Sequence, residues 1–179
     1  MSKQKITTRD LCLIGIFTAF TCAMAQVTIP LPLIPMTMQT FCIPFVGIVL
    51  GSKRGAFSAL VYALLGAVGL PVFAGFTGGL GIVFGPTGGF ILSFPLMALL
   101  AGIGAEKGGK VWLWSGLVLG AVVNYLCGMF MFSAVTGLGL AAAFAKAVLP
   151  FLPTAAIKIL LSGWLGVKCK TLLQKRVPA

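Results

Sequence analysis

The sequence has no histidine and only two acidic residues, Asp10 and Glu106, among its 179 residues. Metal centres and acid–base catalysis depend on imidazole and carboxylate groups, so we expect no metal site, no cofactor and no hydrolytic active site. The five cysteines form no C-x-x-C pair and are expected to be small buried residues. The phosphate-binding motif of ATPases is absent. These absences favour a binding protein without an energy source of its own.

Charge of either sign is scarce, because hydrophobic residues make up 59% of the chain and charged residues only 8%. The mean hydropathy is +1.12, and several apolar runs reach the roughly 17–25 residues that span a bilayer. The net charge of +11 comes from basic residues that flank these runs, as topology signals do. The distribution predicts contact with the lipid bilayer and argues against a nucleic-acid partner. The flanking residues are Lys3, Lys5, Arg9, Lys53, Arg54, Lys107, Lys110, Lys168, Lys170, Lys175 and Arg176.

The fold class predicted from these runs is an all-α membrane protein with six transmembrane helices in a single domain, residues 1–179. An even number of spans places both termini on one side. All basic residues except Lys146 and Lys158 then fall on that side, which predicts cytoplasmic N- and C-termini in the cell membrane. The predicted helices cover residues 8–27, 39–51, a segment after the basic turn 52–55 up to residue 70, and residues 87–104, 111–133 and 148–173.

Glycine is concentrated in residues 69–94, a stretch that is too apolar for a solvated linker. Glycine costs about 1 kcal/mol per helical position, and irregular backbone at membrane depth must line a cavity or be buried in protein. One interpretation is the wall or lid of a ligand site near the outer face, with Gly78 and Gly88 close to the ligand. The other is a hairpin whose glycines allow close helix packing. Residues 28–38 are predicted to form an apolar outer loop, and residues 134–147 an irregular link.

The first predicted helix carries a small residue at every fourth position. Gly15, Ala19 and Ala23 therefore lie on one face, where small side chains let another helix approach closely. The partner is either another helix of this chain or a separate subunit. At the start of this helix, Thr7 and Asp10 have the spacing of a capping box.

Lys158 lies deep in the last predicted helix, about 15 Å from Lys168 at 1.5 Å per residue. A charge at the centre of a bilayer costs roughly 2.5–3.5 kcal/mol even on lenient scales, and no acidic residue is near it in the sequence. Three explanations are open: the side chain extends to the outer surface, it loses its proton, or it pairs with an anionic ligand. We favour a ligand carboxylate.

Asn124 is the other polar group near the middle of a predicted helix. A buried amide must find hydrogen-bond partners, either on a neighbouring helix or on a ligand. Further polar side chains could reach a site near the outer face. They are Gln39, Thr40, Tyr62, Thr77 and Thr87.

Several segments of the sequence together resemble the BioY family, whose members are the biotin-binding substrate components (S components) of energy-coupling factor (ECF) transporters. The resemblance covers nearly the whole chain and implies six helices, a biotin pocket near the outer face and a bacterial plasma membrane. It also implies a complex with a transmembrane coupling protein and two cytosolic ATPases, docked through small residues of the first helix, here Ala19 and Ala23. The segments are IPLPLIPMTMQTF (29–41), GLPVFAG (69–75), GPTGGF (85–90), and LPFLP followed by Lys158 (149–158).

Biotin suits the candidate residues. Its carboxylate would pair with Lys158, its ureido ring would contact Asn124 or Gln39, and its apolar body would pack near Phe73. The family pattern commonly has an aspartate three residues before the lysine of the last helix, where this sequence has Ala155, so Lys158 is without that partner. The alternatives are an S component for another vitamin, a membrane-embedded enzyme acting on a lipid or prenyl substrate, and a channel.

Overall fold

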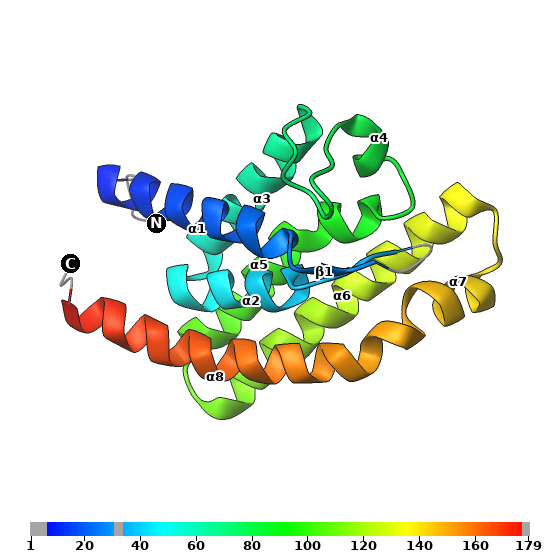
Figure 1. Ribbon diagram of the computed structural model, residues 1–179. Coiled ribbons are helices and arrows are strands. Elements are labelled where there is room, and N and C mark those ends of the chain that lie inside the picture. The colour runs from blue at the N-terminus through cyan, green and yellow to red at the C-terminus, as the bar shows by residue number, and fades with distance from the viewer. Residues whose placement is uncertain (1–6, 31–33, 177–179) are drawn as a thin grey trace, which may run out of the picture.

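The structure is a computed structural model that describes residues 7–30 and 34–176. It is a helical bundle with one short antiparallel strand pair (Figure 1). In chain order the elements are α1 (Thr8–Ala25), β1 (Thr28–Ile29), β2 (Met36–Thr37), α2 (Gln39–Leu50), α3 (Ser52–Ala67), α4 (Leu80–Val83), α5 (Gly88–Lys107), α6 (Lys110–Thr136), α7 (Leu140–Ala147), the 3-10 turn η1 (Leu149–Phe151) and α8 (Leu152–Arg176).

Helices lie at all six predicted positions, but within the described residues four segments are long and apolar enough to cross a membrane. They are Thr8–Ala25, Gly88–Lys107, Lys110–Thr136 and Leu140–Leu173. α2 has 12 residues and α3 has 16, fewer than the ~20 that a perpendicular span requires. The bundle therefore combines long helices with two short helices that are joined by a tight turn at Gly51, which has a φ of 88°.

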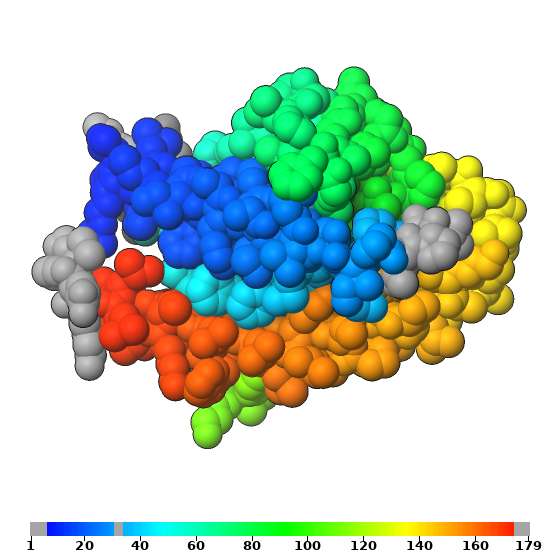
Figure 2. Space-filling model, viewed as in Figure 1, coloured from blue at the N-terminus to red at the C-terminus, as the bar shows by residue number. Residues whose placement is uncertain are grey.

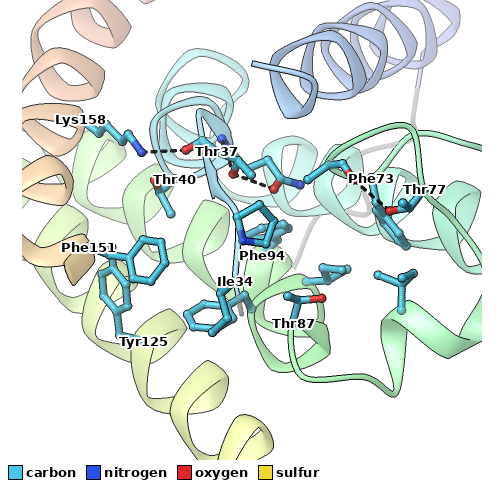
Figure 3. Close-up of a pocket in the computed structure, with 16 residues that line it drawn as sticks. Ile34, Thr37, Thr40, Phe73, Thr77, Thr87, Phe94, Tyr125, Phe151 and Lys158 are labelled. Atoms are coloured by element: carbon cyan, nitrogen blue, oxygen red, sulfur yellow. Dashed lines mark hydrogen bonds between the residues drawn. The ribbon is translucent and has the colours of Figure 1, made fainter. Parts of the chain in front are cut away.

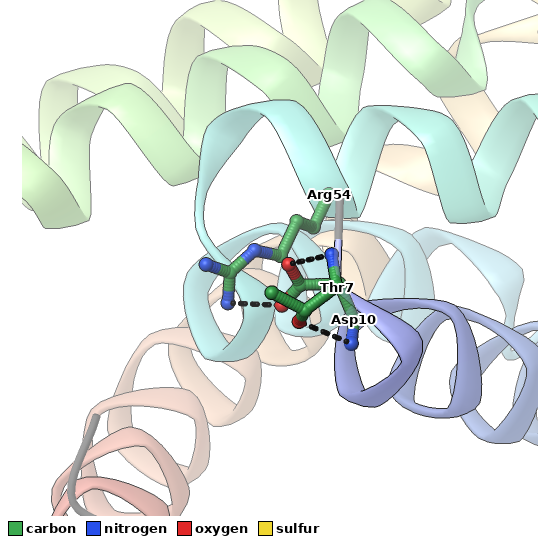
Figure 4. A network of polar contacts seen from close by, with 3 residues as sticks. All are labelled: Thr7, Asp10 and Arg54. Atoms are coloured by element: carbon green, nitrogen blue, oxygen red, sulfur yellow. Dashed lines mark hydrogen bonds and ion pairs between the residues drawn. The ribbon is translucent and has the colours of Figure 1, made fainter. Parts of the chain in front are cut away.

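The start of α1 is fixed by the predicted capping box. The Thr7 hydroxyl accepts a hydrogen bond from the Asp10 amide at 3.2 Å, and the Asp10 carboxylate accepts one from the Thr7 amide at 3.1 Å. The same carboxylate lies 3.2 Å from the Arg54 guanidinium of α3 (Figure 4). The cap therefore also ties the first turn of α1 to the first turn of α3.

Glycines bring the backbones of α2, α3 and α5 into direct contact at the centre of the bundle. A Cβ added at Gly47 of α2 would collide with the Ala98 carbonyl of α5, and one at Gly102 of α5 would collide with Ser52 at the start of α3. A Cβ at Gly55 would meet the backbone of Gly47. Small residues allow this close approach between membrane helices, and here they fix the three innermost helices as one block.

The segments between the helices are more ordered than the sequence predicted. The expected loop 28–38 contains the strands β1 and β2, with Thr28 opposite Thr37. The expected irregular link 134–147 contains α7, whose alanines Ala143 and Ala147 are fully buried. Residues 28–38 are a non-helical loop as predicted, with a two-residue strand pair added, and residues 31–33 of it lie outside the described part of the chain. The prediction of an irregular link at 134–147 was wrong, because a short helix that covers a bundle needs only a few packed residues and leaves little periodicity in the sequence.

The bundle has two different ends. The first turn of α1 and the last turns of α8 lie at one end, whereas β1, β2, α4 and α7 gather at the other (Figure 1). Loop residues with positive φ occur at this second end, at Gly69, Gly75 and Gly79, and also at Phe76, with a φ of 56°. Irregular backbone at this end creates the space for a pocket.

We expect Gly102→Ala to lower the free energy of unfolding by about 1–3 kcal/mol, the usual cost of overpacking, because the new methyl group would collide with the backbone of Ser52. The matched control is Gly15→Ala, whose added Cβ has no atom within 4 Å and should gain stability from its helix propensity. Unfolding of the purified protein in detergent measures both. Equal stability of the two variants would show that α3 and α5 are not in backbone contact.

Candidate functional site

A pocket of about 260 Å³ opens among the elements at the second end of the bundle (Figure 3). Most of the residues that line it come from β2 and α2, from the loop that precedes α4, from α5 and α6, and from η1 and α8. Ligand sites of this kind are mostly apolar, with a few placed polar groups. The lining consists of Ile34, Pro35, Thr37, Gln39, Thr40, Phe73, Ala74, Thr77, Ile82, Thr87, Phe90, Ile91, Phe94, Tyr125, Phe151 and Lys158.

A chain of hydrogen bonds crosses the pocket wall. The Lys158 ammonium of α8 donates to the Thr37 carbonyl of β2 at 2.7 Å. The Thr37 hydroxyl donates to Gln39 Oε1 at 2.8 Å (Figure 3). Gln39 Nε2 in turn donates to the Tyr62 hydroxyl at 2.5 Å. The strand β2 is therefore the bridge that links α8 to α2 and α3 across the mouth of the pocket.

The glycine-rich loop is tied to α1 through Gln26, directly after the last residue of that helix. Gln26 Nε2 donates to the Phe73 carbonyl at 3.0 Å, and Gln26 Oε1 accepts from the Phe76 amide at 2.9 Å. The Tyr62 hydroxyl donates to the Val72 carbonyl of the same loop at 3.2 Å. Sequence reasoning missed Gln26. Its only signal is that it is a polar side chain at the end of an apolar helix and before a proline-rich segment.

The remaining wall is aromatic. Phe73 is 2% exposed and packs edge-on against the Tyr62 ring, with the ring centroids 5.6 Å apart. Phe90 and Tyr125 form a second edge-to-face pair at 6.2 Å. Such pairs bury apolar area and also fix the orientation of the rings, so the pocket has stiff apolar sides.

Lys158 is the one charged residue that lines the pocket in the described part of the chain. Its side chain is half-buried, and its recorded partner is a neutral carbonyl. Ala155, one turn earlier on α8, is buried and supplies no carboxylate. Within residues 7–30 and 34–176 no carboxylate therefore pairs with the ammonium, and this arrangement suits an anionic group on the ligand.

The structure brings most of the predicted site residues together. Lys158, Gln39, Thr40, Phe73 and Thr87 all line the pocket. Thr77, the other predicted threonine, lines it as well. Tyr62 does not, because its ring is fully buried behind Phe73, and it acts on the site through Gln39.

Asn124 does not line the pocket, contrary to our expectation of ligand contact. Its side chain is fully buried between α6 and α5, where Nδ2 donates to the Phe90 carbonyl at 2.9 Å and to the Ser93 hydroxyl at 2.8 Å. The alternative of helix-to-helix hydrogen bonding describes it correctly. The error arose because depth in a helix does not reveal which face of that helix meets the pocket.

Gly78 and Gly88 do not line the pocket either. An added Cβ would collide with the Leu70 carbonyl at Gly78 and with the Val83 carbonyl at Gly88. Gly78 thus allows close backbone packing within the loop, and Gly88, the first residue of α5, allows it between α5 and the end of α4, which is nearer to the second interpretation of the 69–94 stretch. The stretch nevertheless forms part of the pocket wall through other residues, including Phe73 and Thr87.

The small-residue face of α1 points away from the bundle. Gly15, Ala19 and Ala23 are exposed, whereas Thr18 lies on the buried face and hydrogen-bonds Ser58 of α3 at 3.0 Å. Packing against another helix of this chain was one of the two explanations for the spacing, and within the described residues it is wrong. The face is free for another molecule.

Comparison with known proteins agrees with these features. Residues 1–175 match the profile of the BioY family. This chain belongs to the BioY family. A probable biotin transporter BioY of Pyrococcus horikoshii is 39% identical over 150 residues, which cover 84% of this chain and 89% of the relative. The biotin transporter BioY of Thermotoga maritima is 36% identical over 169 residues, covering 94% and 99%.

A solved structure has the same fold as this BioY protein. It is the crystal structure of the S-component for biotin from an ECF-type ABC transporter, with a TM-score of 0.84 over 96% of this chain and 95% of that one, at 23% identity. The likeness extends to almost every element of the bundle. Together with the apolar helices, family membership identifies an integral membrane protein.

We expect Asn124→Ala to lower the free energy of unfolding by about 1 kcal/mol, as is typical of hydrogen bonds between membrane helices. The control is Val122→Ala, two residues away on the same helix, whose side chain is 46% exposed and should contribute less. Unfolding in detergent compares the two variants. If Asn124→Ala were as stable as the control, the amide would have no part in joining α5 to α6.

Proposed function

We propose that this protein is the biotin-binding S component of an ECF-type vitamin transporter, and that biotin binds in the pocket beside Lys158. The observation that carries the proposal is that Lys158 is the one charged residue among the described residues that line the cavity, with a neutral carbonyl as its hydrogen-bond partner. Family membership and relatives that are named biotin transporters support the same ligand.

The chemistry of biotin matches the groups that line the pocket. Its carboxylate would replace the Thr37 carbonyl as partner of the Lys158 ammonium. Its ureido group would exchange hydrogen bonds with Gln39 and Thr40, which stand at the start of α2. Its bicyclic body would pack between aromatic walls such as Phe73. Asn124 is not part of this contact set because its fully buried side chain does not line the pocket and its Nδ2 donates to α5.

The orientation in the membrane follows from charge. We infer six spans, in which α2 and α3 cross as a short pair at the centre of the bundle, with both termini in the cytoplasm and the pocket near the outer face of the plasma membrane. Basic residues at the terminal end of the bundle and their scarcity at the pocket end support this orientation. Lys146 and Lys158 are the exceptions, and Lys158 is assigned to the ligand.

Transport requires partners, because the sequence has no nucleotide-binding motif. We propose that a transmembrane coupling protein docks on the exposed face of α1 formed by Gly15, Ala19 and Ala23, and that two cytosolic ATPases drive the complex. Exposure of all three small residues supports the docking face. A membrane-embedded enzyme and a channel gain no support from the relatives, which are named transporters.

Lys158→Met should weaken biotin binding by about 3–5 kcal/mol, because the ligand carboxylate would be left unpaired in a buried site. Isothermal titration calorimetry with the purified protein measures the loss. Folding should be little affected, since the lysine gives up one hydrogen bond to a carbonyl.

The control ligand is biotinamide, which has no charge. It should bind the wild type more weakly than biotin does, and it should bind Lys158→Met about as well as biotin binds that variant. The double comparison isolates the charge pair from packing. Equal losses of biotin and biotinamide on substitution would show that Lys158 does not meet the carboxylate.

Ala19→Leu combined with Ala23→Leu should leave biotin affinity unchanged and abolish most uptake by cells, because bulky side chains would prevent a partner helix from approaching α1. The control is Ile16→Leu on the same helix, which keeps the size of a side chain that is already 63% exposed. Uptake of labelled biotin and calorimetry on the same variants separate docking from binding. A parallel fall in affinity would mean that the α1 face shapes the pocket.

A further inference from the structure

A second cavity lies at the opposite end of the bundle from the pocket. It is an open cleft of about 1080 Å³ between the first turns of α1, the turn from α2 to α3, the end of α5 and the last turns of α8. Figure 2 shows a hollow between the blue start of α1 and the red end of α8. We call it the basic cleft. It is lined by Thr7, Arg9, Asp10, Leu13, Val49, Leu50, Gly51, Ser52, Lys53, Arg54, Glu106, Lys170 and Leu173.

Positive charge is in excess in the basic cleft, because four basic residues and only two carboxylates line it. Both carboxylates already have partners. Asp10 is held by its helix cap and by Arg54 (Figure 4). Glu106 accepts hydrogen bonds from the Ser52 amide at 2.6 Å and from the Ser52 hydroxyl at 2.8 Å.

Two lysines of the cleft have no anionic partner among the described residues. The Lys170 ammonium donates to the neutral Ala105 carbonyl at 3.1 Å. Lys53 is exposed at the start of α3, and no ion pair or hydrogen bond is recorded for its side chain within residues 7–30 and 34–176. An anion placed between α3 and α8 would be attracted by both lysines.

Four of the residues that line the cleft are apolar, and we call them its apolar floor: Leu13, Val49, Leu50 and Leu173, from α1, α2 and α8. A free inorganic anion would gain nothing from such a floor, whereas a molecule with a charged head and an apolar tail would use both surfaces. Aromatic anchors place the cleft at the depth of the lipid headgroups. At this end of the bundle Lys107 lies 4.1 Å from the Trp112 ring centre and Lys168 lies 3.7 Å from that of Trp164.

We propose that the basic cleft is a binding site for one anionic phospholipid. Its phosphate lies between Lys53 and Lys170, and the start of an acyl chain covers the apolar floor between α1 and α8. Basic pockets at helix ends attract acidic headgroups in this way. The lipid would contact both the first turn of α1 and the last turns of α8. The site is remote from the pocket and does not depend on the identity of the transported ligand.

The test titrates the detergent-purified full chain with dioleoylphosphatidylglycerol and, separately, dioleoylphosphatidylcholine, and counts bound lipid by native mass spectrometry. Lys53→Gln with Lys170→Gln should weaken the first phosphatidylglycerol about 30-fold, since each basic residue near an anionic surface contributes about fivefold. Phosphatidylcholine binding should stay unchanged. Lys107→Gln with Lys110→Gln removes the same charge outside the cleft and should change the first affinity less than about threefold.

If both double variants lost the same affinity for phosphatidylglycerol, or if neither lost any, the proposal would be overturned, because binding would then be diffuse or located elsewhere. Excess glycerol 3-phosphate should not displace the lipid. Displacement would reveal a simple anion site without a tail contact and would also overturn the proposal.

Lys53→Gln alone, which removes no hydrogen bond or ion pair within the described residues, repeats the test if the double variant does not fold, and about fivefold weaker binding of phosphatidylglycerol is expected. Unchanged biotin affinity in these variants keeps the outcome separate from the proposed transport function.

Discussion

The hydrogen bond from Lys158 to the Thr37 carbonyl joins residues 121 positions apart in the chain, and it connects two sides of the pocket. It fastens the strand β2 to α8. Through Gln39 and Tyr62, β2 in turn meets α2, α3 and the loop after α3. A half-buried ammonium that donates to a neutral carbonyl is costly in a membrane. The same group therefore joins two sides of the pocket wall and also attracts an anion.

The rigid centre of the bundle makes this arrangement possible. α2, α3 and α5 touch through their backbones at glycines, and long side chains surround that block. Because α2 and α3 are short, one end of the bundle is closed by loops and short elements, and the pocket forms there. At the other end the same short helices leave the basic cleft between α1 and α8. Both cavities thus follow from helices that are shorter than their neighbours.

The sequence was sufficient to predict the membrane class, six helix positions, the cap at Thr7 and the place of Lys158 among the residues that line the pocket. These features rest on hydrophobic length and on the energetic cost of charge, which are local properties of the chain. It was not sufficient for Asn124 or Gln26. A helix that is apolar on all sides gives no amphipathic signal to show which face is buried. Only the packed structure therefore shows that Asn124 joins two helices and that Gln26 holds the loop.

Gln26 also joins the loop that lines the pocket to the end of α1 through hydrogen bonds. Its amide uses both ends, with Nε2 as donor to the Phe73 carbonyl and Oε1 as acceptor from the Phe76 amide. A glutamate at this position could serve as acceptor only, and an apolar residue could do neither. If α1 shifts or tilts as a rigid body, residues 72–76 must either move with it or lose their hydrogen bonds to Gln26. A movement of α1, whose small-residue face is exposed, is therefore coupled to the loop that lines the pocket.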